Sequence, residues 1–233
     1  MIDMGYLIIV GLFTAVGALV SGRLKSKFKK YSQIGISSNQ SGAQVAQDML
    51  SHYGIHDVKI VEGRGFLSDH YNPLKKIIAL SPDVYRGKSI AAAAVAAHEC
   101  GHAVQHAQAY QMLKVRSALV PAVQASSKVQ QFLFMGFMFG AAGAGAALGN
   151  FFMLALVITF GMTALFSIIT LPVEFDASKR ALVWLDNTGT TQGAEYEGAK
   201  DALWWAAMTY VASALSALVM FLYFLLQFMG GRD

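Results

Sequence analysis

Charged residues are scarce in this sequence of 233 residues, and long stretches of it contain none. Asp, Glu, Lys and Arg make up 14% of the chain, whereas hydrophobic residues make up 55% and the mean hydropathy is +0.45. In an ordinary soluble domain about a quarter of the residues are charged. Because the deficit is concentrated in long apolar runs, the composition indicates an integral membrane protein.

Cysteine is nearly absent as well. The single cysteine, Cys100, has no partner in the chain with which to form a disulfide. It falls on a predicted helix, where a small buried residue is a commoner role than a reactive thiol or a metal ligand. We therefore expect Cys100 to be buried and inert.

Four uncharged runs are predicted to span the membrane. They cover residues 4–20, 132–148, 151–171 and 202–229. The middle two are separated only by Gly149-Asn150, which we expect to form a hairpin. Transporters and channels place ionisable residues within their spans, and the absence of such residues here argues against that class.

Basic residues follow the first run instead of preceding it, which is typical of a retained anchor and not of a cleaved signal peptide. They are Arg23, Lys25, Lys27, Lys29 and Lys30. The positive-inside rule then places residues 31–131 and 172–201 in the cytoplasm. Anionic lipid headgroups and this topology account for the net charge of +4, so we predict no nucleic-acid partner.

Between the first two runs, the pattern predicts a small α+β domain. Apolar residues at helical spacing predict a helix over 41–53, and two short apolar runs at 57–61 and 76–80 predict strands. We expect the edge of the second strand to hold an extended substrate chain. A further helix begins after Ser89, and Pro121 is expected to interrupt the helical run toward residue 132.

The motif H-E-x-x-H lies on that further helix and is the most informative feature of the chain. Residues four apart share one helix face, so His98 and His102 can present two imidazoles to one metal ion. Glu99 lies beside them and can accept the proton of a water molecule at the metal. This arrangement is typical of a zinc hydrolase.

A catalytic zinc ion usually has three protein ligands, and two residues are the main candidates for the third. His106 is two helical turns from His98, about 12 Å along a continuous helix, which is too far unless the helix breaks. Glu174 directly follows the third apolar run on the same predicted side of the membrane. By position alone, Glu174 is either a ligand or a solvated interfacial charge. Glu62, Glu195 and Glu197 are weaker candidates.

The chain resembles neutral zinc metallopeptidase family 2, the YugP-like membrane peptidases of bacteria. The resemblance rests on the basic stretch after the first run and on the segments LSDHYNPLKKIIALSPDVY, AVAAHECGHAVQHA and LPVEFDASKRA. It implies a gluzincin-like zinc site, with His98, His102 and Glu174 as ligands of one zinc ion per chain and Glu99 as the general base. The implied fold is mainly α, with four transmembrane helices and a small cytoplasmic α+β peptidase domain.

Supporting residues are less sharply predicted. In gluzincins an aspartate one turn after the third ligand often orients a ligating histidine, whereas this chain has Ser178 there and Asp176 nearby. Either could accept a hydrogen bond from a ligating imidazole, and Asp176 could equally be a plain surface charge. His70 or Tyr71 could donate a hydrogen bond to the developing oxyanion if their loop folds over the metal.

The predicted function is that of a zinc-dependent endopeptidase in the bacterial inner membrane. Its substrates would be membrane-associated or misfolded proteins at the cytoplasmic face, with membrane lipids as neighbours. Assembly with a second copy or with a membrane partner protein is compatible with this placement. The alternative function is a non-catalytic zinc-binding scaffold or regulator, which would have no use for Glu99.

Overall fold

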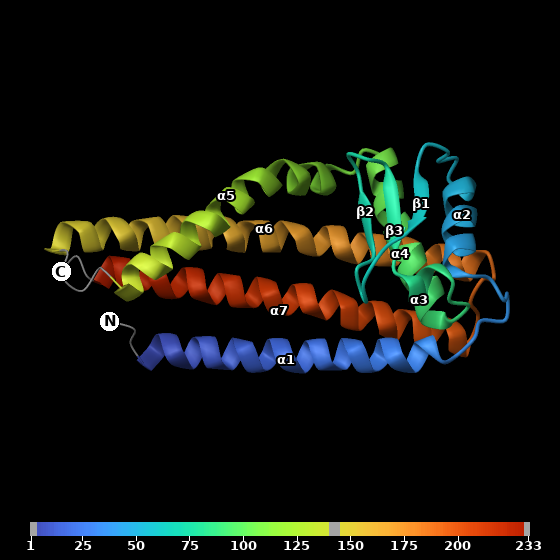
Figure 1. Cartoon of the computed structure of the whole chain (residues 1–233), viewed down its shortest axis with the longest axis horizontal. Coiled ribbons are helices and arrows are strands. Elements are labelled where there is room, and N and C mark those ends of the chain that lie inside the picture. Colours follow the sequence, from blue (N-terminus) through green and yellow to red (C-terminus); the bar gives the residue numbers. More distant parts are fainter. Residues whose placement is uncertain (1–3, 140–144, 231–233) are drawn as a thin grey trace. The chain divides into compact units, whose positions relative to one another are not determined.

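The computed structural model describes residues 4–139 and 145–230 and is mainly helical, as predicted (Figure 1). In chain order, the elements are α1 (Met4–Ser32), α2 (Gly42–His52), β1 (Lys59–Glu62), β2 (His70–Asn72), β3 (Ile77–Leu80), α3 (Pro82–Tyr85), α4 (Ile90–Ala107), α5 (Gln111–Phe139), α6 (Gly145–Asn187) and α7 (Ala194–Gly230).

The chain forms two compact units, and the four long helices α1, α5, α6 and α7 contribute to both. A helical unit contains the described residues of Met1–Leu19, Val115–Leu171 and Thr209–Asp233. A mixed unit contains Val20–Lys114 and Pro172–Met208, and therefore includes the whole sheet together with α2, α3 and α4. All predicted site residues belong to the mixed unit.

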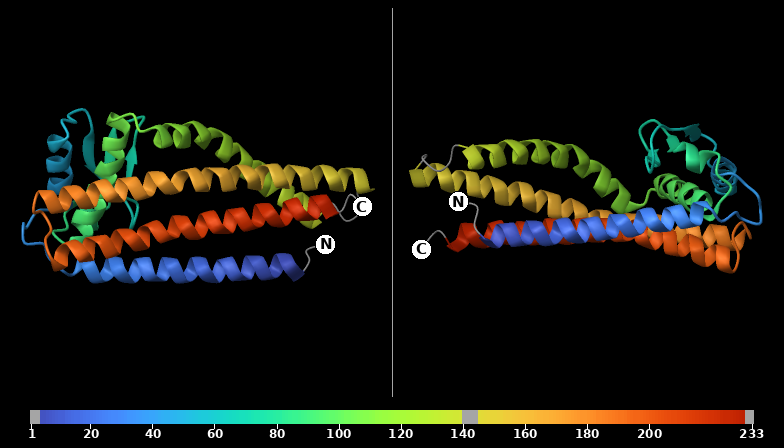
Figure 2. Two further views of the ribbon diagram at one scale, coloured as in Figure 1. Left: turned by 180° about the vertical axis from the view of Figure 1, so that it is seen from behind. Right: turned by 60° about the horizontal axis from the view of Figure 1, so that its bottom comes forward.

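Local signals explain where α2 and α4 begin. Ser41 accepts a hydrogen bond from the Gln44 N–H, and the Gln44 side chain accepts one from the Ser41 N–H, which forms a complete capping box. Ser89 caps α4 by accepting a hydrogen bond from the Ala92 N–H. The two helices pack against each other and contact the sheet (Figures 1 and 2).

The sheet has the strand order β1-β3-β2, with β1 parallel and β2 antiparallel to β3. The predicted strands at 57–61 and 76–80 are confirmed as β1 and β3, each shifted by one or two residues. β2 was not predicted, because three residues are too few to show a period. β3 is the central strand, so the expectation that its edge holds substrate is wrong, and the outer strands are β1 and β2.

Three predicted helix boundaries are absent from the structure. Pro121 lies inside α5, because a proline removes one hydrogen bond and bends a long helix more readily than it ends it; Figure 1 shows α5 bent. Gly149-Asn150 lies inside α6 and forms no hairpin. α6 also continues through Pro172 to Asn187, so the expected helix end at residue 171 is absent.

Three helices are long and apolar enough to span a membrane, instead of the four predicted. Within the described residues these are Met4–Ser32, Gly149–Asn187 and Ala194–Gly230. The predicted span at 132–148 is not among them, and part of it, 140–144, lies outside the described residues. Much of α5 before that point is polar, with Lys114, Arg116 and Lys128, which lowers its mean hydropathy.

Each unit has its own apolar core. In the helical unit, Leu156 and Val157 of α6 pack with Met220 and Phe224 of α7. Many other apolar side chains of this unit are exposed, such as Ile8, which is what a lipid environment favours. The core of the mixed unit is built on the alanine-rich α4, whose small side chains let neighbouring elements approach closely.

At Gly101, α4 approaches the backbone of α6 closely. A Cβ atom placed on Gly101 would lie 2.5 Å from the carbonyl oxygen of Ala177, which is backbone and cannot move aside. Ala177 is itself fully buried. Only glycine at position 101 allows the helix that carries His98 and His102 to approach the segment that carries Glu174 this closely.

We predict that Gly101→Ala destabilises the mixed unit by about 1–3 kcal/mol, because the added methyl group must push the two helices apart. The matched control is Gly22→Ala, where the new Cβ would meet nothing within 4 Å. Thermal unfolding of both variants in detergent, followed by circular dichroism, measures the difference. Equal melting temperatures for the two variants would contradict the close packing of α4 on α6.

Candidate metal centre

Helix α4 places His98 and His102 one above the other on one face, as their spacing predicts. Their ring centroids are 4.8 Å apart and the rings are nearly perpendicular, at 84°. Helix α6 brings Glu174 against the same face. The three side chains are largely enclosed, with exposed fractions of 14% for His98, 10% for His102 and 2% for Glu174.

The distances between these side chains suit a tetrahedral metal ion. The Glu174 Oε2 atom lies 3.4 Å from His98 Nε2 and 3.6 Å from His102 Nε2. The candidate ligand atoms of the three residues all lie within 4.8 Å of one another. Zinc bonds of about 2.0–2.1 Å in a tetrahedron imply ligand separations of about 3.3–3.4 Å. The donor set of two imidazoles and one carboxylate therefore fits zinc in both chemistry and spacing.

The burial of Glu174 distinguishes between its two interpretations, a metal ligand and a solvated interfacial charge. A solvated interfacial charge would be exposed, whereas this carboxylate is almost fully enclosed on an apolar helix. A buried carboxylate is costly unless it is paired with positive charge. Burial lowers the pKa of His102, but its electrostatic interactions with Glu174, whose Oε2 atom is 3.6 Å away, and with Glu99 raise it overall. The cluster therefore attracts a cation.

Gln105 fixes the orientation of His102, and this residue was not predicted. Gln105 is fully buried, and its Nε2 atom donates to the Val173 carbonyl and to Asp176 Oδ2, at 2.8 Å each. With both amide protons used, its Oε1 faces His102 Nδ1 at 3.0 Å and must accept a hydrogen bond. His102 is therefore protonated at Nδ1, which leaves Nε2 as the nitrogen that faces Glu174.

Both predicted supporting residues lie at the site, in different roles. Ser178 Oγ lies 3.1 Å from His98 Nδ1 and can accept its proton, which turns His98 Nε2 toward Glu174. Asp176 reaches His102 only through Gln105, and Arg180 donates to Asp176 from the following turn. Gln105 could have been suspected from its spacing, three residues after His102, although nothing marked it as buried.

The remaining candidates lie elsewhere. His106 is exposed, and its Nδ1 atom is hydrogen-bonded to the Tyr71 hydroxyl at 2.7 Å. His70 is also exposed, and its Nδ1 atom contacts the Ser68 carbonyl. The three weaker acids have other partners: Glu62 pairs with Arg86, Glu195 accepts hydrogen bonds from Ser37, and Glu197 pairs with Lys200.

Cys100 is buried, as predicted. Its thiol has no exposed surface and donates to the Ala46 carbonyl at 3.5 Å. Burial, and to a lesser extent the nearby charge of Glu99, raise the pKa of this thiol well above its ordinary value. The thiol is therefore protonated at neutral pH, and the candidate metal-ligand cluster consists of His98, His102 and Glu174 without it.

Two histidines one helical turn apart, an adjacent glutamate and a third ligand from another helix are typical of zinc-dependent hydrolases. Comparison with known proteins agrees with this class. The chain belongs to the family described as "Putative neutral zinc metallopeptidase", whose model matches residues 6–229. This confirms the resemblance found in the sequence.

A curated relative is "Putative membrane protease YugP" of Bacillus subtilis (strain 168). It is 41% identical to this chain over 212 residues, which cover 91% of each protein. No solved structure matches the chain.

We predict that Gln105→Leu lowers zinc affinity about 10- to 100-fold, because His102 loses the acceptor that holds its tautomer. Gln108→Leu is the matched control: it makes the same change one turn later, at an exposed residue that contacts Arg180. Competition with a chromogenic chelator measures both affinities. If the two variants bound zinc equally well, Gln105 would have no part in holding the site.

Proposed function

We propose that this protein is a zinc-dependent membrane endopeptidase, with one zinc ion per chain held by His98, His102 and Glu174. The observation that carries the proposal is the set of distances among the three side chains, together with the burial of Glu174. Zinc in this position would supply Lewis-acid polarisation of a water molecule and of the scissile carbonyl.

Glu99 is the proposed general base. It follows His98 directly on α4, is 8% exposed, and lies close enough to His102 for its charge to act on that imidazole. Its carboxylate would accept the proton of the attacking water and return it to the leaving amine. Gln105 and Ser178 would meanwhile keep the Nδ1 protons of the two histidines in place.

The contacts favour Tyr71 over His70 as the donor to the developing oxyanion. Tyr71 contacts His106, which lies one helical turn beyond His102 on the same face of α4. Burial, with a smaller effect of Asp57, raises the pKa of Tyr71 to about 12, so its hydroxyl keeps its proton at neutral pH. Tyr71 also lies on the outer strand β2, whose edge could hold an extended substrate chain.

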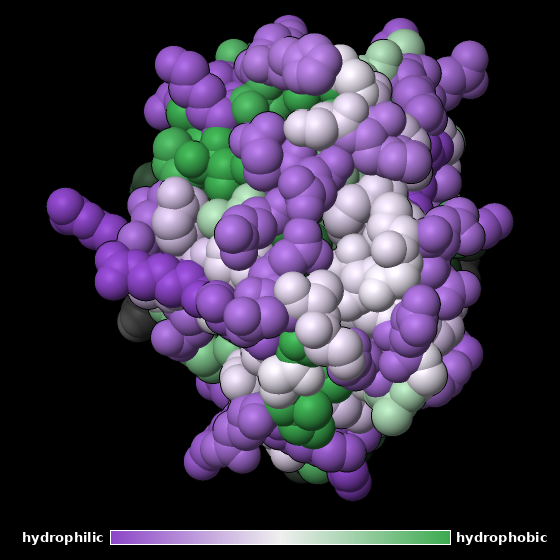
Figure 3. Space-filling model, turned by 90° about the vertical axis from the view of Figure 1, so that its right-hand side faces the viewer, coloured by the Kyte–Doolittle hydropathy of each residue, from purple (hydrophilic) through white to green (hydrophobic). Residues whose placement is uncertain are grey.

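The proposed location is the cytoplasmic face of the bacterial inner membrane. Basic residues lie in the C-terminal part of α1, which belongs to the mixed unit. The parts of α6 and α7 in the same unit carry Lys179, Arg180 and Lys200. Hydrophilic side chains cover most of the face of the mixed unit seen in Figure 3. Substrates at this location would be membrane-associated or misfolded proteins.

We expect Glu99→Gln to retain zinc and to lose at least about 100-fold of its peptide hydrolysis, because the amide cannot accept the water proton. Release of a fluorophore from a quenched casein substrate, with zinc content measured alongside, tests this. The control variant is Gln44→Glu, a change at the exposed start of α2, which should leave hydrolysis and zinc content unchanged. Unchanged hydrolysis or phenotype in Glu99→Gln would instead favour the non-catalytic zinc scaffold.

Single cysteines test the topology in a Cys100→Ala background. Asn150 and Asn187 are both exposed, on opposite sides of the predicted span at 151–171. We expect Asn150→Cys to react with an impermeant maleimide on intact cells and Asn187→Cys to react only after lysis. The reverse pattern would place the site outside the cytoplasm.

A further inference from the structure

A second site lies in the mixed unit, away from the metal centre. An open cavity of about 760 Å³ separates part of α1 from the segment around α3. The residues important to its chemistry are Lys25, Phe28, Lys29, Phe66, Asp83 and Arg86. None of them contacts His98, His102 or Glu174 in any hydrogen bond or ion pair of the described residues.

Helical spacing divides the basic residues of α1 between two faces. Lys27 and Tyr31 face α7, where both donate to Asp201, at 2.6 Å and 2.7 Å. Lys25 and Lys29, also four residues apart, lie on the face that lines the cavity. Within the described part of the chain, no ion pair neutralises either of these two lysines.

The cavity combines this positive charge with an apolar wall. Arg86 is neutralised by Glu62, at 2.8 Å, which leaves two lysines facing one acid, Asp83. Phe28 and Phe66 meet edge to face with their centroids 5.4 Å apart, and Phe66 is 55% exposed. A ligand that fits both features is anionic at one end and apolar at the other.

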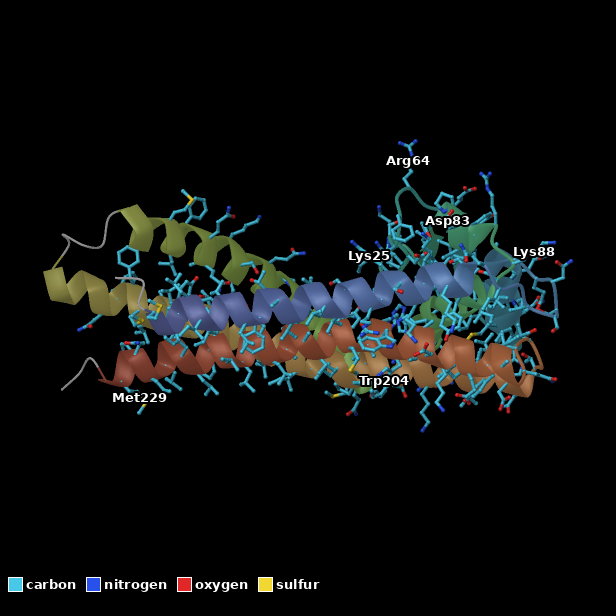
Figure 4. The ribbon with its side chains drawn as sticks, turned by 90° about the horizontal axis from the view of Figure 1, so that it is seen from below. Lys25, Arg64, Asp83, Lys88, Trp204 and Met229 are labelled. Atoms are coloured by element: carbon cyan, nitrogen blue, oxygen red, sulfur yellow. The ribbon has the colours of Figure 1, made fainter. Side chains whose placement is uncertain are left out.

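The height of the cavity along α1 indicates where such a ligand comes from. Lys25 is five residues beyond Val20, the end of the uncharged run, and this corresponds to about 7.5 Å of helix. The Lys27–Asp201 ion pair holds α1 against α7. Figure 4 shows Lys25 and Trp204 at about the same position along the length of these helices. Trp204 is 54% exposed, and exposed tryptophans collect at the headgroup layer of a membrane.

We propose that this cavity binds one anionic phospholipid. Lys25 and Lys29 hold its phosphate, and Phe28 and Phe66 contact the glycerol and the first acyl carbons. Asp83 lies at the same cavity and disfavours ligands with a higher negative charge. The bound lipid would anchor the start of the mixed unit at the membrane surface, independently of any hydrolytic activity.

Native mass spectrometry of the full-length protein in a neutral detergent tests this site. The probes are short-chain phosphatidylglycerol, phosphatidylcholine with the same chains, and inorganic phosphate. We expect one phosphatidylglycerol to bind more tightly than phosphatidylcholine. The double variant Lys25→Gln/Lys29→Gln should weaken this binding about 30-fold, since each lysine near an anionic lipid contributes about fivefold.

The control variant is Arg23→Gln/Lys30→Gln, which removes the same charge from α1 at positions that do not line the cavity. Zinc content checks that both double variants are folded. Phe66→Ser should weaken the binding of phosphatidylglycerol and leave the zinc content unchanged. Asp83→Asn should strengthen the binding of phosphatidylglycerol. Equal losses in the two double variants, equal binding of the two lipids, or inorganic phosphate displacing the lipid at similar concentration would each overturn the proposal.

Discussion

The burial of one carboxylate governs the arrangement of the mixed unit. Glu174 is 2% exposed, and a buried carboxylate is stable as an anion only beside positive charge. Two imidazole nitrogens lie 3.4 Å and 3.6 Å from its Oε2 atom. A divalent cation among the three groups would satisfy the carboxylate and both imidazoles at once.

The surrounding packing maintains that arrangement. Gly101 lets α4 approach the backbone of α6 at Ala177, which brings the histidines and Glu174 within range of one ion. Behind the histidines, Gln105 and Ser178 hold the Nδ1 atoms, and Asp176 and Arg180 extend the hydrogen-bond network outward. A metal site at these residues would be rigid, because the Nδ1 atom of each imidazole is held by a hydrogen-bond partner.

Local sequence patterns predicted the parts of the site that depend on local geometry. The placement of His98 and His102 on one face of α4 follows from helix periodicity, and the cap at Ser89 follows from the preference for serine before a helix. Glu174 was a candidate metal ligand because a carboxylate so close to an apolar run is costly unless it is paired or binds a metal. Gln105 escaped notice because its role depends on a contact with α6, which no local pattern reveals. The central position of β3 in the sheet depends on tertiary packing in the same way.

Zinc bound per chain, compared between the wild type and Glu174→Gln, tests most directly whether this carboxylate completes a metal site. The glutamine variant keeps the size of the side chain and removes its charge. Plasma emission spectrometry of detergent-purified protein is expected to find about one zinc ion in the wild type and far less in the variant. An equal zinc content in both proteins would contradict the assignment of Glu174 as the third ligand.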